Sequence, residues 1–84
     1  MAESSDEAQA RAFAEMLVVE IASASTRVEK SEQCARKASR VGDSRSQAWH
    51  SEEARTLRRT LYELHRQLDA LRTRFPGMTT PTYS

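Results

Sequence analysis

Seven apolar residues in the second half of the chain recur at alternating intervals of three and four positions. They are Ala54, Leu57, Leu61, Leu64, Leu68, Leu71 and Phe75. Because an α-helix turns once in 3.6 residues, this spacing gathers all seven side chains into one stripe along a helix. Such a stripe needs an apolar partner of similar length. That need constrains the possible folds more than any other feature of the sequence.

The first half of the chain contains a matching stripe of small and aliphatic residues. It consists of Ala10, Ala14, Leu17, Ile21, Ala24, Val28, Ser31, Ala35 and Ala38. Folding the chain back at Gly42 brings the stripes face to face, with Leu17 near Leu71. We therefore expect an all-α fold, an antiparallel helical hairpin packed like a coiled coil. We call the contact between the stripes the hairpin seam; its larger members are Leu17, Ile21, Val28, Leu57, Leu61, Leu64, Leu68, Leu71 and Phe75.

Composition agrees with a single helical domain. The chain has 84 residues, of which 38% are hydrophobic and 30% are charged. It contains only two glycines and two prolines, whereas a β-rich fold of this size would need many more turn residues. The hairpin is expected to span residues 6–75.

The ends of the first helix carry clear signals. Ser4 stands three residues before Glu7, the spacing of a capping box, so a short polar arm over 1–5 precedes the helix. No proline or glycine follows until Gly42, which suits the position just past a helix C-terminus. The first helix is therefore expected over about 6–41.

The sequence defines where the second helix ends but leaves several possible positions for its start. Its start has several possible caps: Asp43, Ser44 or Ser46 early, or Ser51 later. We favour the early start, with a turn over 42–46 and a helix over about 47–74. Pro76 restricts the residue before it and so ends the helix. Residues 76–84 are expected to form a flexible tail.

The segment AEMLVVEIA, residues 14–22, is apolar on more than one side. An isolated hairpin would leave some of its large side chains in water. A two-helix layer also has too small an interior for a stable domain. We therefore expect a homodimer that forms a four-helix bundle, or alternatively a surface for a different protein. The expected interface residues are Phe13, Met16, Val18, Val19, Trp49 and Tyr62.

Charge is unevenly distributed along the chain. Residues 1–20 have a net charge of −4, residues 21–45 of +3, and residues 46–84 of +2. The basic turn end suggests phosphate contact as an alternative function, in a nucleic-acid-binding module. The residues expected to make that contact are Arg36, Lys37, Arg40 and Arg45. No nucleic-acid-binding motif or interleaved aromatic residue accompanies them.

The sequence predicts no catalytic residue, metal site or cofactor. Cys34 is the single cysteine, so it cannot form a disulfide within the chain. Di-iron bundles use Glu-x-x-His pairs, whereas His50 precedes its glutamates. The polar, acidic N-terminus does not resemble a signal peptide. The longest apolar run, 16–19, has four residues, and a membrane span needs about 20. We expect a cytoplasmic protein without membrane contact.

Two family resemblances rest on short segments. HRQLDALR, residues 65–72, resembles the Ser-x-x-x-Asp helix of the small aspartyl-phosphate phosphatases of sporulating bacteria, with His65 in place of the serine. That resemblance implies action of Asp69 on a phosphorylated response regulator. The overall plan also resembles the Trp-x-Gly hairpins exported by type VII secretion systems, but His50-Ser51 follows Trp49. The function we expect is a non-enzymatic interaction or regulatory protein.

Overall fold

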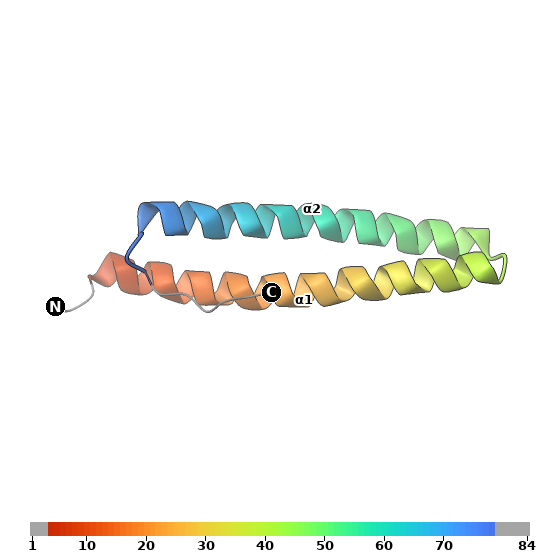
Figure 1. Ribbon diagram of the computed structural model, residues 1–84, viewed down its shortest axis with the longest axis horizontal. Helices are drawn as coiled ribbons and strands as arrows, with labels where there is room; N and C mark the ends of the chain where they lie inside the picture. Colours follow the sequence, from red (N-terminus) through yellow and green to blue (C-terminus); the bar gives the residue numbers. More distant parts are fainter. Residues whose placement is uncertain (1–3, 79–84) are drawn as a thin grey trace.

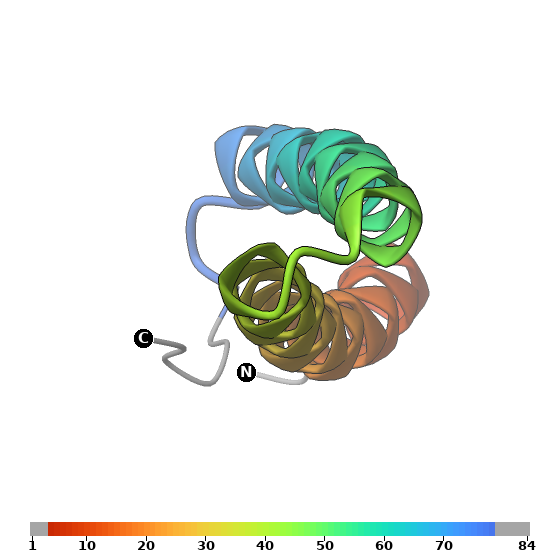
Figure 2. The same cartoon turned by 90° about the vertical axis from the view of Figure 1, so that its right-hand side faces the viewer.

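The computed structural model describes residues 4–78, which form two long antiparallel helices joined by a short turn (Figure 1). Helix α1 runs Ser5–Arg40 and helix α2 runs Ser44–Arg74. The hairpin extends 61 Å along its long axis and 16 and 14 Å across it. Viewed toward the turn, the helices tilt across each other (Figure 2). Residues 4–78 contain no strand, so the expected all-α hairpin is confirmed.

Local hydrogen bonds set the start of α1. The Ser4 hydroxyl oxygen accepts a hydrogen bond of 3.1 Å from the backbone N–H of Glu7. This bond satisfies one of the N–H groups that a first turn leaves unpaired. The side chains of Asp6 and Glu7 add negative charge at the positive end of the helix dipole. The helix begins at Ser5 and ends at Arg40, each one residue before the expected bound.

Two residues, Gly42 and Asp43, form the short turn between the helices. Gly42 has φ of 77°, and its N–H donates to the carbonyl of Ser39, while the N–H of Asp43 donates to the carbonyl of Ala38. This pair of bonds is a Schellman motif, which places glycine in the left-handed region. Asp43 then caps α2, because its Oδ1 accepts from the N–H of Ser46 at 3.1 Å. Helix α2 therefore begins at Ser44, three residues before the expected position.

Acid is expected to weaken this turn. The hydrogen bond from the Ser46 backbone holds the pKa of Asp43 below its ordinary value of 3.8, with further lowering from the Ser46 hydroxyl and His50. A lowered pKa in the folded state adds stability above the unfolded-state pKa, and that stability is lost as pH falls through the folded-state value. Asp43→Asn should therefore reduce the loss of stability on acidification below about pH 4. Urea unfolding at neutral and acid pH measures the effect.

The control for this prediction is Glu29→Gln, which removes an exposed carboxylate from the middle of α1. It should leave the acid-dependent loss close to that of the wild type. Equal behaviour of Asp43→Asn and the wild type would contradict the role of the cap.

The hairpin seam forms the core of the structure. Eight of its nine α1 positions are buried: Ala10, Ala14, Leu17, Ile21, Ala24, Val28, Ser31 and Ala38. On α2, Ala54, Leu57 and Leu68 are buried, and Leu61, Leu64 and Leu71 are half-buried, as is the C-cap residue Phe75. Leu68 packs in one cluster with Ala14, Leu17 and Ile21. The buried set is rich in alanine, so the core is thin.

The chain after α2 turns back toward α1 (Figure 1). The N–H of Met78 donates to the carbonyl of Phe75 at 3.0 Å, and Met78 packs against the Leu68 cluster. The beginning of the expected flexible tail therefore contributes to the core. Residues 1–3 of the expected arm and 79–84 of the expected tail lie outside the described residues.

Candidate association surface

Six large apolar side chains of the described region are between 49% and 73% exposed. They are Phe13, Met16, Val19, Val41, Trp49 and Tyr62. Five of them were expected from their positions off the hairpin seam. Val41 was not, because it lies beside Gly42 at the C-cap of α1. Single exposed apolar residues are common on protein surfaces, whereas several on one side of the molecule indicate an interaction surface.

Phe13 and Trp49 lie on the same side of the hairpin. Residues separated by whole heptads share a side, because the seam keeps the heptad period. Phe13 lies two heptads before Arg27 and therefore on the same side of α1. Arg27 lines a shallow pocket together with Trp49 and Glu53 of α2. Arg74 lies three heptads after Glu53 on α2. We call this side the tryptophan face; it includes Phe13, Met16, Arg27, Trp49, Glu53 and Arg74.

A second pocket opens on the tryptophan face near the helix ends opposite the turn. Its volume is about 230 Å³, and it is lined by Asp6, Gln9, Ala10, Phe13, Leu71, Arg74 and Phe75. The guanidinium carbon of Arg74 lies 5.5 Å from the centre of the Phe75 ring, a cation–π distance. We call this site the open-end pocket. Sequence reasoning missed Asp6, Gln9 and Arg74, although the heptad spacing already placed Asp6 one repeat before Phe13.

Three other expected interface residues lie elsewhere. Val18 is half-buried and packs against the Leu68 cluster, so it belongs to the hairpin core. It lies beside the seam, where the opposite helix covers it. Val19 lines an outward-facing pocket on α1 that Met16 also lines. Tyr62 lies one heptad after Arg55, on the side opposite the tryptophan face. The structure thus brings Phe13 and Trp49 to one side, with Met16 at its outer edge next to Val19, and places Val18 and Tyr62 elsewhere.

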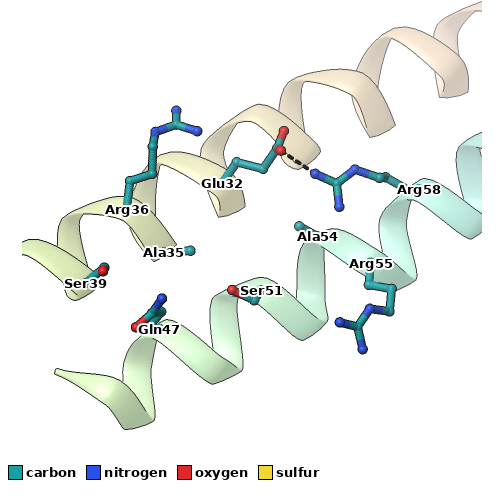
Figure 3. Close-up of a pocket in the computed structure, with 9 residues that line it drawn as sticks. All are labelled: Glu32, Ala35, Arg36, Ser39, Gln47, Ser51, Ala54, Arg55 and Arg58. Carbon is teal, nitrogen blue, oxygen red and sulfur yellow. Dashed lines mark hydrogen bonds and ion pairs between the residues drawn. The ribbon is translucent and has the colours of Figure 1, made fainter.

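The opposite side carries a polar groove of about 360 Å³ (Figure 3). We call it the arginine groove; it is lined by Glu32, Ala35, Arg36 and Ser39 of α1 and by Gln47, Ser51, Ala54, Arg55 and Arg58 of α2. An ion pair between Arg58 and Glu32 bridges the helices. Arg55 pairs with Glu52 at 2.9 Å. Arg36 points away from α2 (Figure 3). Two of the three guanidinium groups therefore already face carboxylates.

The structure does not gather the four expected phosphate-binding residues on one surface. All four are exposed: Arg36, Lys37, Arg40 and Arg45. Arg36 lines the arginine groove, whereas Lys37 lies three heptads after Met16 and hence toward the tryptophan face. Arg36 and Lys37 therefore lie on different sides of the hairpin.

The remaining candidates for chemistry are dispersed. The rings of Trp49 and His50 form a T-shaped pair with centres 4.9 Å apart, and the buried Nδ1 of His50 has no hydrogen-bond partner among the described residues. Asp69 is exposed one turn after the half-buried His65. Cys34 is an exposed free thiol. Residues 4–78 contain no group of three or more His, Cys, Asp or Glu side chains placed to hold a metal ion.

Neither α1 nor α2 contains, within residues 4–78, an apolar stretch of the length that a bilayer crossing requires. Comparison with known proteins found no matching family model, no matching curated protein and no matching solved structure.

Proposed function

We propose that this chain is a small, non-enzymatic interaction protein of the cytoplasm that works as a homodimer. The dimer is a four-helix bundle in which two hairpins meet through their tryptophan faces. One observation carries the proposal: a thin core combined with exposed Phe13, Met16 and Trp49 on one side. Leu68 is the largest described side chain with less than 2% exposure. A second hairpin packed on this face buries these apolar side chains and adds the interior that a two-helix layer lacks.

The charges of α1 favour a second copy as the occupant of this face. Residues 5–20 carry four acidic side chains and one basic, whereas residues 21–40 carry five basic side chains and two acidic. The two halves therefore have net charges of −3 and +3. A second copy with its α1 reversed complements both halves at once, and closed two-fold pairs are the commonest protein assemblies. Cys34 stays a free thiol in a reducing compartment.

Nucleic-acid binding has less support. Arg55 and Arg58 of the arginine groove are paired with Glu52 and Glu32, and Arg36 and Lys37 at the turn end lie on different sides of the hairpin. The proposed phosphatase role has only Asp69 to support it.

Sedimentation equilibrium tests the proposal directly. At micromolar concentration the full chain should have about twice the 9.5 kDa mass of one copy. Met16→Arg should raise the dissociation constant at least tenfold, because dimerisation would bury its guanidinium group opposite the basic half of the partner's α1. Gln33→Arg adds the same charge at an exposed position of α1 and should leave the mass unchanged. A wild-type mass of one copy would overturn the proposal.

A further inference from the structure

We propose that the two copies pair antiparallel, with Trp49 of each copy seated in the open-end pocket of the other. This inference rests on the proposed self-association and adds its geometry. It assigns the open-end pocket as the receptor for an aromatic side chain and Trp49 as its ligand. Each dimer then contains two identical contacts.

The positions of Trp49 and the pocket meet the requirement of a two-fold axis. Gln47 and Ser51 line the arginine groove together with Ser39, so Trp49 is level with the end of α1 near Ser39. That level lies 26 residues beyond Phe13, or about 39 Å at 1.5 Å per residue. A two-fold axis midway between them, near residue 26 of α1, exchanges the two ends. Each Trp49 then faces the part of the other copy's open-end pocket that Leu71 and Phe75 line. Because the axis is two-fold, the same contact forms twice.

The pocket offers the chemistry that an indole ring needs. Phe13, Leu71 and Phe75 form apolar walls, and Trp49 is 62% exposed in the single hairpin. Arg74 already lies against the Phe75 ring, and the other side of its guanidinium can stack on a second aromatic ring. The carboxylate of Asp6 and the amide oxygen of Gln9 are acceptors for the indole N–H, which requires a partner when buried.

Charge selects the antiparallel arrangement over the parallel one. In the antiparallel dimer, α1 stacks on α1. With the axis near residue 26, residues 12–20 of each copy, with a net charge of −2, face residues 32–40 of the other, with a net charge of +2. In the parallel dimer, α1 stacks on α2. The +3 half of α1 then faces residues 44–59, which carry four basic and two acidic side chains. Like charges across an interface disfavour that arrangement.

Tryptophan fluorescence provides the first test, because Trp49 is the single tryptophan of the chain. In the full-length dimer we expect blue-shifted emission and protection from iodide quenching, both lost on dilution to the monomer. Phe13→Ser removes a pocket wall and should expose Trp49 to iodide. Tyr62→Ser, on the opposite side, is the matched control and should leave quenching unchanged. A dimer whose Trp49 is quenched as readily as in the monomer overturns the inference while leaving the proposed dimer intact.

Cysteine cross-linking provides the second test. Arg27 lies near the proposed axis, so Arg27→Cys combined with Cys34→Ser should form a disulfide-linked dimer on mild oxidation. The wild-type Cys34 residues would lie about 24 Å apart along the bundle, beyond the roughly 7 Å Cα separation that a disulfide tolerates. Wild type should therefore stay uncross-linked.

Two outcomes overturn the antiparallel geometry alone. One is linkage of the wild type through Cys34. The other is a double variant, Arg27→Cys with Cys34→Ser, that sediments as a dimer but forms no disulfide on oxidation. A monomeric mass overturns the proposed function as well.

Discussion

Leu68→Ala should lower the free energy of unfolding by about 2–5 kcal/mol. Leu68 has no exposed surface and packs against Ala14, Leu17 and Ile21. The small Ala14 cannot fill the space that the truncation leaves, so a cavity remains. A chain of this length has a total stability of only about 4–13 kcal/mol. The variant should therefore be close to the limit of folding.

Urea unfolding followed by far-UV circular dichroism measures this loss, at one fixed protein concentration because dimerisation contributes to stability. Leu61→Ala is the matched control, since Leu61 belongs to the same stripe but is only half-buried. It should lose clearly less stability. Equal losses for the two variants would show that the core is not centred on Leu68.

Trp49→Ala should raise the dissociation constant of the proposed dimer about 1,000-fold. A buried tryptophan at the centre of a contact contributes at least about 2 kcal/mol. A two-fold dimer contains the contact twice, so the loss is about 4 kcal/mol, which corresponds to that factor. Because Trp49 lies on the surface of the single hairpin, the helical content of the monomer should change little. Sedimentation over a range of concentrations measures the dissociation constant.

Tyr62→Ala is the matched control for this substitution. Tyr62 is an aromatic residue of α2 with 68% exposure, close to the 62% of Trp49, but it lies on the opposite side. Its truncation should change the dissociation constant less than threefold. Comparable weakening by both truncations would mean that apolar exposure in general drives association, without a specific tryptophan contact.

The path of each helix could be predicted from short-range sequence signals. The spacing of Leu57 to Leu71 defines a stripe whatever the surrounding structure, because it depends only on helical periodicity. Ser4 and Gly42 marked helix ends for similarly local reasons, a side-chain cap and a left-handed backbone. The start of α2 was placed three residues late, because Asp43 completes the Schellman motif and caps the next helix at once. That double role appears only when the turn is closed.

Tertiary structure decided which side of the hairpin each remaining residue occupies. Every large apolar residue off the seam looked equally available in the sequence. The packing of α2 against α1 covered Val18, left Tyr62 on the far side, and brought Phe13 and Trp49 to a common face. It also formed the open-end pocket from residues about 60 positions apart, Phe13 and Phe75 among them. Helical periodicity is encoded within a few residues, whereas a shared face and a pocket exist only after two distant segments have packed.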